Sequence, residues 1–437
     1  IVVEYAGDSL HNPVTVTSEV KFTVAKRDLT ITFTDSAYAA VDELTKVYGE
    51  ATDKLYVKIS GLAKDEDYKH IFATELEGNY MLVYPEDYPD GLAIFDIVYT
   101  LGGNVSDMSD RTAAGTYMIN IRGNATDSSV NYNIVVNSVP YVISRRPVKV
   151  TAPSVSVTYG ESVPALAYTA EQADGTTARG LLEGDVLRGA LGREPGYDAG
   201  TYKITVGTLS NSNYYVQFYV DDPENRPFVT INQRNVYIRM KSYSATYGSD
   251  FTVSSDFAEY FADSALQNTE NVFAASDIAN GQTVEDILGV LTIVYGIGGE
   301  TVETPWMNGV GEYGISGVFI EVPDRADNYN VIFTPGVMAV QRRSVGVQVE
   351  NITAEYGDMS VAGIASLVID YTFDAATEYT GLVDGDELEL YFGVSVSGSV
   401  LTVGDYAITL TGWSNDNYIV TANNANLSVT AKNLSVV

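Results

Sequence analysis

The 437-residue chain contains no cysteine and only two histidines, His11 and His70. Disulfide bonds and thiol chemistry are therefore excluded, and the two histidines lie too far apart to predict a triad or a zinc site. Walker-type loops and Gly-x-Gly-x-x-Gly fingerprints between a strand and a helix are also absent. Carboxylates are plentiful, but they fall on turns and show no pairing that predicts glycoside hydrolysis. We expect a protein that is not an enzyme and needs no cofactor.

Basic residues are scarce: 25 lysines and arginines stand against 57 aspartates and glutamates, for a formal net charge of −32. Such a chain repels nucleic acid and anionic membranes, so neither is an expected partner. No apolar run approaches the ~18 residues of a membrane span. The first residue is Ile1, inside an apparent strand, which indicates a processed or excised piece of something longer.

Tyrosine is abundant, with 32 residues against 14 phenylalanines and two tryptophans. Tyrosine suits half-buried strand positions, where the ring packs and the hydroxyl stays wet. The hydrophobic fraction of 45% is sufficient for ordinary cores. The composition is typical of an exposed β-protein.

A closing strand, a basic or basic-polar pair and an opening strand recur along the chain. The five copies lie at 22–31, 141–150, 229–238, 338–347 and 427–436. They predict part of a preceding β module (1–27), a first module with an insertion (28–146), a second module (147–233), a third with an insertion (234–343), a fourth (344–432) and the start of a following module (433–437). The junctions are only about three residues long, which leaves little room for a hinge. We expect their basic residues to form salt bridges or guard a sheet edge, and a ligand-binding basic patch is the alternative.

Four landmarks repeat in the same order inside the modules. A Tyr-Gly pair that predicts a turn stands at 48–49, 159–160, 247–248 and 356–357. Gly-Leu-x-x-Gly-Asp stands at 180–185 and 381–386, with a degenerate copy at 61–68. An alternating strand follows at 114–121, 199–206, 311–318 and 403–410. Asn-Tyr then opens another strand at 131, 213, 328 and 417, where the asparagine is expected to close a turn through its side chain.

This ordered set resembles the MBG ("mostly beta-grasp") domains of the Tyr-Gly-x type, which occur in tandem in large bacterial surface proteins and adhesins. Residues 147–233 and 344–432 match best, whereas 28–146 and 234–343 lack a clear Gly-Leu-x-x-Gly-Asp element and carry insertions. The resemblance implies an extracellular location on a bacterial cell surface. It supplies no catalytic residues.

The fold we predict is all-β with short helical turns: a tandem array of β-grasp-like or sandwich-like modules that forms an elongated rod. The favoured function is a structural stalk, or a fibre or surface-assembly element, in adhesion. Neighbouring modules are then the main partners, with self-association into fibres or a surface layer as an extension. The alternative is a module that binds a glycan or host protein through the insertions at 64–92 and 256–290. The second insertion is expected to be partly helical, with Ser276 or Asp277 as a cap.

Calcium is the one metal that the acidic turns suggest. The candidate ligands are Asp221, Asp222, Asp324, Asp327 and Asp416, with the Gly-Asp pairs at Asp185 and Asp386 as further candidates. Calcium takes six to eight oxygens, and none of these loops has the EF-hand pattern, so ordinary turn chemistry is the favoured interpretation. No clear triad for a lysine isopeptide crosslink is present.

Overall fold

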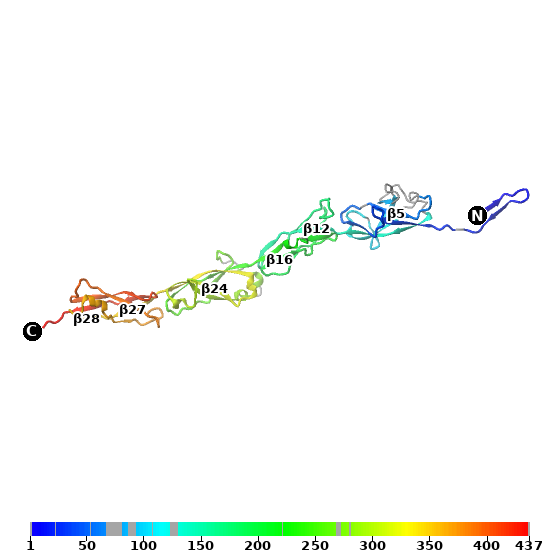
Figure 1. Ribbon diagram of the computed structural model, residues 1–437. Helices are drawn as coiled ribbons and strands as arrows, with labels where there is room; N and C mark the ends of the chain where they lie inside the picture. Colours follow the sequence, from blue (N-terminus) through cyan, green and yellow to red (C-terminus); the bar gives the residue numbers. More distant parts are fainter. Residues whose placement is uncertain are drawn as a thin grey trace. The chain divides into compact units, whose positions relative to one another are not determined.

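The computed structural model describes residues 2–21, 23–52, 54–66, 81–85, 93–106, 108–122, 130–220, 222–267, 272–278 and 281–435. The chain divides into two compact units. Unit 1 comprises 1–155, 164–195 and 202–229, and unit 2 comprises 156–163, 196–201 and 230–437. Figure 1 labels strands of both, among them β5 (Leu55–Ser60) and β12 (Arg146–Thr151) of unit 1 and β24 (Gly311–Ile320) and β27 (Arg343–Val349) of unit 2. The structure is mostly strand, with only short helices, which confirms the all-β class.

The second module has two small sheets. The first sheet joins β14 (Thr169–Ala170), β12 (Arg146–Thr151) and β17 (Tyr214–Phe218) in that order. The second joins β13 (Val155–Thr158), β18 (Phe228–Asn232), β16 (Gly200–Thr205) and β15 (Gly192–Arg193). A 3₁₀ turn, η3 (Pro223–Asn225), precedes β18.

The fourth module repeats this order. Its first sheet joins β29 (Tyr371–Phe373), β27 (Arg343–Val349) and β32 (Tyr418–Ala422). Its second joins β28 (Ile352–Glu355), β33 (Ala425–Thr430), β31 (Gly404–Trp413) and β30 (Leu390–Val394), and η5 (Val361–Ser366) lies between β28 and β29. Two sheets with no long helix fit the sandwich-like alternative better than a β-grasp.

The third module adds a strand and three short helices to the same plan. Its first sheet joins β21 (Ala258–Phe261), β19 (Arg234–Met240) and β25 (Tyr329–Thr334). Its second joins β20 (Tyr243–Thr246), β26 (Gly336–Gln341), β24 (Gly311–Ile320), β22 (Val290–Ile297) and β23 (Glu300–Val302). The helical pieces are α1 (Ala275–Ile278), α2 (Val284–Leu288), α3 (Pro305–Asn308) and η4 (Asp324–Asn328).

The insertion at 256–290 is partly helical, as expected, but the predicted cap is wrong. Ser276 and Asp277 lie inside α1. Thr283 instead caps α2, because its hydroxyl accepts the Asp286 amide while the Asp286 carboxylate accepts the Thr283 amide.

The first module merges its two sheets into one path of strands. Its order is β10 (Tyr132–Asn137), β3 (Arg27–Thr34), β5 (Leu55–Ser60), β6 (Met81–Pro85), β7 (Ala93–Leu101), β9 (Gly115–Arg122), β11 (Val139–Ser144) and β4 (Leu44–Val47), with β8 (Asn104–Ser106) beside β7. Strand β6 comes from the insertion at 64–92 and pairs with β5 and β7 of its own module. The rest of that insertion, residues 67–80 and 86–92, lies outside the described residues, and so does His70.

Residues 2–17 form a hairpin of β1 (Val2–Tyr5) and β2 (Val14–Thr17) with exposed side chains. Strand β2 ends at Thr17, before the further apolar residues Val20 and Val24.

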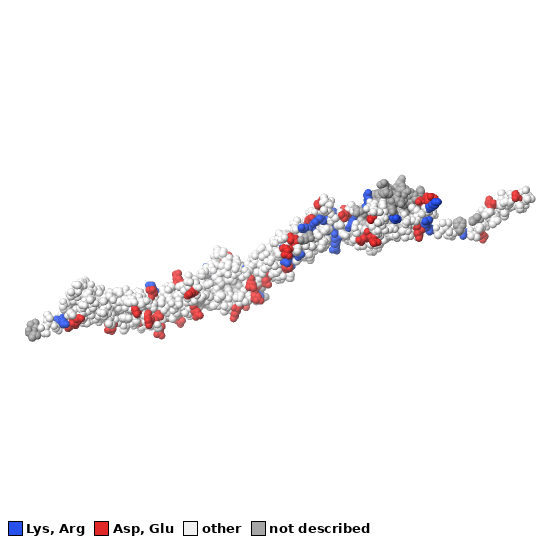
Figure 2. All heavy atoms as spheres, viewed as in Figure 1, with Lys and Arg blue, Asp and Glu red and all other residues white. Residues whose placement is uncertain are grey.

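The alternating strands bury one side of each module. In β3, Leu29, Ile31 and Phe33 are fully buried, and Val236 and Ile238 repeat this arrangement in β19. Most charged groups remain on the surface. The buried ones in the described part of the chain are Lys46, Arg146 and Arg343, with Asp277 as the one buried carboxylate. Figure 2 shows acidic side chains scattered over the face it presents in both units. The acidity therefore belongs mainly to a solvated surface.

Candidate functional site: the joints between successive modules

The landmarks converge on the places where one module meets the next. We call these places joint 1 (Tyr48, Arg146, Asp185 and Tyr214), joint 2 (Tyr159, Arg234, Asp277 and Tyr329) and joint 3 (Tyr247, Arg343, Asp386 and Tyr418). Joint 1 lies within unit 1, and joints 2 and 3 lie within unit 2. Each joint draws its four side chains from four separate stretches of sequence.

Strand register places the arginine beside the second tyrosine. The first strand of a module pairs in parallel with its Asn-Tyr strand, and the pairs Arg146–Tyr214, Arg234–Tyr329 and Arg343–Tyr418 open the three ladders. The Tyr-Gly tyrosine of the preceding module is held by its own last strand, as in the 2.9 Å bond from the Tyr48 amide to the Ser144 carbonyl. Only one residue separates that last strand from the next module's first strand.

Two tyrosine rings meet edge to face in every joint. The ring centroids are 5.6 Å apart for Tyr48–Tyr214, 5.5 Å for Tyr159–Tyr329 and 5.7 Å for Tyr247–Tyr418. All six rings are buried, at 7% exposure or less. An edge-to-face pair contributes about 0.5–1.5 kcal/mol beyond its buried area.

One aspartate accepts the tyrosine hydroxyls. Tyr329 Oη donates to Asp277 Oδ2 at 2.6 Å, and Tyr159 Oη of the preceding module donates to Asp277 Oδ1 at 3.0 Å. In joint 3, Tyr418 and Tyr247 both donate to Asp386 Oδ2, the latter at 3.0 Å. Burial, followed by the bond to aspartate, raises the pKa of Tyr329 and Tyr418 well above the usual range.

Joint 1 varies this scheme. Tyr214 Oη donates to Asp185 Oδ2 at 2.5 Å, and Arg111 Nη1 lies 3.2 Å from the same Oδ2. Arg111 also hydrogen-bonds the Tyr48 side chain, so it connects the first module's tyrosine to the carboxylate. The two modules are joined here by an ion pair and its associated hydrogen bond.

The junction arginine binds carbonyl oxygens, which differs from the expected salt bridge or edge guard. Arg146 Nε donates to Gly180 O of the second module at 3.0 Å, and Nη1 donates to Tyr48 O of the first module at 3.2 Å. Arg343 repeats both bonds, to Gly381 O at 2.8 Å and Tyr247 O at 3.3 Å. Both arginines are 3% exposed. A planar guanidinium with five donors can satisfy several carbonyls at once, whereas an ammonium offers three donors from a point charge.

The asparagine of Asn-Tyr also reaches the preceding module. In each joint the asparagine Oδ1 accepts a backbone N–H of the preceding module. The pairs are Ala114 N to Asn213 at 3.0 Å, Ala199 N to Asn328 at 2.6 Å and Val310 N to Asn417 at 2.9 Å. The expected role in closing its own turn belongs to other asparagines, since Asn211 and Asn415 accept the amides of Asn213 and Asn417 at 3.0 Å.

A tyrosine in the alternating strand holds the loop whose backbone N–H donates to this asparagine. Tyr117 Oη donates to Ala113 O at 2.9 Å, and Tyr313 Oη donates to Gly309 O at 2.8 Å. Each bond runs four residues back along the chain and ties down the loop that presents Ala114 or Val310.

The glycine of Tyr-Gly is required at the joints for conformation and for space. Gly49, Gly160 and Gly248 have φ of 86°, 85° and 69°, which disfavours residues with a Cβ. A Cβ on Gly248 would lie 2.3 Å from Val383 Cγ2, and one on Gly160 would lie 2.5 Å from Ala274 Cβ. Side chains of the next module therefore pack directly against these glycines.

The fourth Tyr-Gly corner lacks these contacts. Gly357 has the same left-handed conformation, with φ of 89°, but a Cβ there would meet nothing within 4 Å. Tyr356 is 44% exposed, in contrast to the three buried corner tyrosines. The corner conformation therefore forms without a neighbour, and the neighbour is what buries it.

The structure places the degenerate copy at 61–68 and identifies one element that the sequence pattern missed. Gly61–Glu66 corresponds to Gly-Leu-x-x-Gly-Asp, because Ala63 N donates to Tyr132 Oη at 2.9 Å and Tyr132 hydrogen-bonds Glu66. In the third module, Ala274 N donates to Tyr329 Oη at 3.0 Å, as Val383 N does to Tyr418 Oη at 3.1 Å. The acidic residue three positions after that amide was the available signal.

The calcium candidates do not converge in the described part of the chain. Asp222 lies before η3 and accepts from Asn225 Nδ2 at 2.7 Å, whereas Asp324 and Asp327 share η4 and Asp416 lies in the loop before β32. Asp221 lies outside the described residues. Among those that are described, no three histidine, aspartate or glutamate side chains gather as a metal site would require. Asp185 and Asp386 are engaged by tyrosines.

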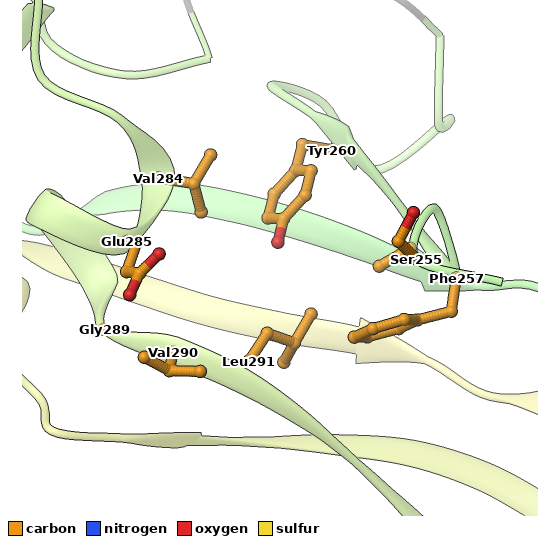
Figure 3. A pocket seen from close by; sticks show the side chains of 9 residues that line it. Ser255, Phe257, Tyr260, Val284, Glu285, Gly289, Val290 and Leu291 are labelled. Carbon is orange, nitrogen blue, oxygen red and sulfur yellow. The ribbon is translucent and has the colours of Figure 1, made fainter. Parts of the chain in front are cut away.

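The insertion of the third module lines a pocket of about 270 Å³ (Figure 3). Tyr260 and Phe257 stand on one wall, and Leu291 and Val284 bring apolar side chains from β22 and α2. Glu285 adds a carboxylate at one side. The pocket has the aromatic and apolar lining of a small ligand site, with Ser255 and Glu285 as polar groups.

No helix among the described residues is long and apolar enough to cross a membrane. No curated protein matches the sequence. Among solved structures, the titin I9–I11 tandem is 12% identical with a TM-score of 0.18, covering 65% of this chain and all of its own. Drosophila N-cadherin EC1-4 is 10% identical with a TM-score of 0.19, covering 90% and 98%. The Bacillus anthracis TIE protein is 11% identical with a TM-score of 0.19, covering 92% and 74%.

Those structural likenesses are too slight to support an argument, but the sequence match to one family is specific. The profile of the MBG domain (YGX type) matches residues 148–222 and 346–428, the cores of the two short modules. Both regions contain a Tyr-Gly corner, a Gly-Asp carboxylate and an Asn-Tyr strand, the groups that build the joints. Two regions of the chain therefore match the MBG domain of the YGX type, which is consistent with tandem MBG domains, and the two longer modules share their joints.

Proposed function

We propose that these modules are a non-enzymatic structural region of a large bacterial cell-surface protein, acting as a stiff extracellular stalk or fibre element in adhesion. The observation that carries the proposal is the repetition of one joint three times. Each joint buries two tyrosines and ties an asparagine to the preceding module. Such contacts tie one module to the next within a unit, which is what a projecting element needs.

Electron microscopy of the native protein, on its cell and after release, tests this proposal. Thin projections that keep a constant bead spacing and end in a distinct head support a stalk, whereas regular sheets or fibres containing these modules support assembly. Particles whose modules take up random orientations would overturn both versions.

A variant sharpens that test. Gly248→Leu should disturb joint 3, because Val383 already fills the space above Gly248. Gly357→Leu in the 437-residue chain is the matched control, because a Cβ on Gly357 meets nothing within 4 Å in this chain. We expect a kink or loose bead after Gly248→Leu and straight particles after Gly357→Leu.

The pocket of the third module favours a second candidate, the binding of a glycan or host protein through an insertion. The half-buried Tyr260 and Phe257 offer the stacking surface that sugar rings use, with Glu285 beside them. Chitin, cellulose and mucin oligosaccharides are suitable probes for the full chain. Binding that is lost in Tyr260→Ala and kept in Tyr391→Ala, an exposed tyrosine of the fourth module, would support this candidate. No binding to any probe would count against it.

A further inference from the structure

The beginning and the end of each module run side by side in the same direction. In the first module, β3 pairs in parallel with β10 from Arg27–Tyr132 to Thr32–Asn137. The chain then continues into a second parallel ladder between β4 and β11, which ends at Val47–Ser144. Only Ser138 separates β10 from β11, so residues 132–144 form an almost continuous extended segment. This segment runs beside β3 and β4, which lie within residues 27–47.

The third and fourth modules repeat this plan. Strand β19 pairs in parallel with β25 and β20 with β26, and β27 pairs in parallel with β32 and β28 with β33. The second module has the first of these ladders, between β12 and β17. The arrangement therefore belongs to the module design and does not depend on the insertions.

This topology determines how a pulling force acts. The chain begins the module at one end of the paired segments and leaves at the other, so tension slides the two segments past each other lengthwise. The hydrogen bonds of a ladder link neighbouring strands sideways, so this motion loads all bonds of both ladders together. A force applied to two strands at the same end of a ladder instead opens the pairs one at a time.

Packing adds to the resistance. The first strands contribute fully buried side chains, such as Leu29 and Phe33 in β3 and Val345 in β27. Sliding these strands exposes apolar surface while it breaks the ladder. The joints carry force from module to module by the shortest path, because a single residue, such as Arg145, links the last strand to the next first strand.

We propose that the first, third and fourth modules are load-bearing clamps, in which the two parallel terminal ladders are sheared when the chain is stretched. This function deepens the proposed stalk role and rests on it only for the source of the load. The clamp predicts that the rupture force of a module depends on the direction of pulling. Its melting temperature has no such dependence.

The test is single-molecule pulling of the full chain through pairs of introduced cysteines, since the protein has none of its own. Handles at Ser344→Cys and Thr430→Cys load the fourth module from its beginning to its end. Handles at Ser344→Cys and Ile419→Cys attach to register partners at one end of the β27–β32 ladder. All three positions are exposed, so both variants should keep the native melting temperature.

We expect the first pair of handles to give rupture forces several-fold higher than the second. Equal rupture forces in the two directions, with equal melting temperatures, would overturn the clamp. A melting temperature that differs between the variants would identify damage to folding. The same comparison in the third module would then decide whether the clamp exists. Its end-to-end handles are Asn235→Cys with Gln341→Cys, and its same-end handles are Asn235→Cys with Asn330→Cys. The microscopy of the native protein remains an independent test of the stalk, so failure of one does not imply failure of the other.

Discussion

At the scale of single residues, the joints depend on the side chains that the Tyr-Gly and Asn-Tyr pairs supply. Tyrosine is used because its ring packs against the partner ring while its hydroxyl reaches the aspartate of the next module. Glycine is used because the corner has a positive φ and a neighbour against it. Phenylalanine in place of the tyrosine would lose the hydroxyl's hydrogen bond to the aspartate. Alanine in place of the glycine would place a Cβ against the neighbouring side chain.

Gly248→Ala should destabilise the chain more than Gly357→Ala. Both changes place a Cβ in the left-handed region, at a cost of about 1–2 kcal/mol, but only Gly248 has Val383 against it. Urea unfolding followed for each variant should show the larger loss in Gly248→Ala. The double variant Gly248→Ala/Val383→Ala should recover part of it, and strict additivity would contradict the packing explanation.

Tyr418→Phe should weaken the fourth module and change its response to alkali. Removing the hydroxyl leaves Asp386 with one donor fewer, at a cost of about 1–3 kcal/mol. Burial and Asp386 raise the pKa of Tyr418 above its unfolded value of about 10. The folded state then retains a proton that the unfolded state loses, so the stabilisation is present below pH ~10 and declines as pH rises above it.

Urea midpoints measured from pH 8 to pH 11 check this expectation. The wild type should lose stability more steeply above pH 10 than Tyr418→Phe does. Tyr391→Phe, which alters a half-exposed hydroxyl of the same module, is the control and should follow the wild type. Parallel curves for Tyr418→Phe and wild type would contradict the assignment.

At the scale of elements, the third module contains two helix starts with a threonine at the N-cap and different cap bonding. Thr283 caps α2 with a complete capping box, whereas Thr304 occupies the same position before α3 with no side-chain cap bond. Helices this short depend on such contacts and on packing more than on propensity.

Thr283→Ala should therefore cost about 1 kcal/mol, the usual value of a lost N-cap, and Thr304→Ala should cost much less. Hydrogen exchange of the 283–289 and 304–309 amides would show whether loosening is confined to α2 in the first variant. Equal losses in the two variants would mean that the cap bond contributes little beside packing of the buried Ile287 and Leu288.

At the scale of the whole molecule, the net charge of −32 raises the question of divalent cations. The described carboxylates do not gather in threes, and the joint carboxylates are occupied by hydroxyls. General screening of a negative surface therefore explains more of any cation effect than a specific site would.

Millimolar calcium and magnesium, compared at equal ionic strength, should raise the melting temperature by the same small amount, and a chelator should leave it unchanged. A rise specific to calcium that disappears in Asp324→Asn/Asp327→Asn would instead reveal a site at η4. Asp358→Asn/Asp405→Asn, which removes two exposed carboxylates elsewhere, is the charge-matched control.

The sequence by itself determined the features that depend on local pattern. Period-two alternation predicted the strands that became β9, β16, β24 and β31, and the Tyr-Gly pairs predicted turns with positive φ. Recurrence of the landmarks predicted repeated all-β modules because identical local preferences produce identical elements. The predicted module boundaries and the rod remain predictions.

Only the tertiary structure decided what those residues contact. The same Asn-Tyr asparagine is locally able to close a turn, yet Asn213 and Asn417 accept amides from the preceding module. The segments Gly61–Glu66 and Val272–Asp277 share only a few residues with the pattern Gly-Leu-x-x-Gly-Asp. The strand register nevertheless brings the carboxylate of each to the tyrosine of the Asn-Tyr strand. A joint unites four stretches far apart in the chain, and such contacts follow from register and neighbouring modules, which a local pattern does not encode.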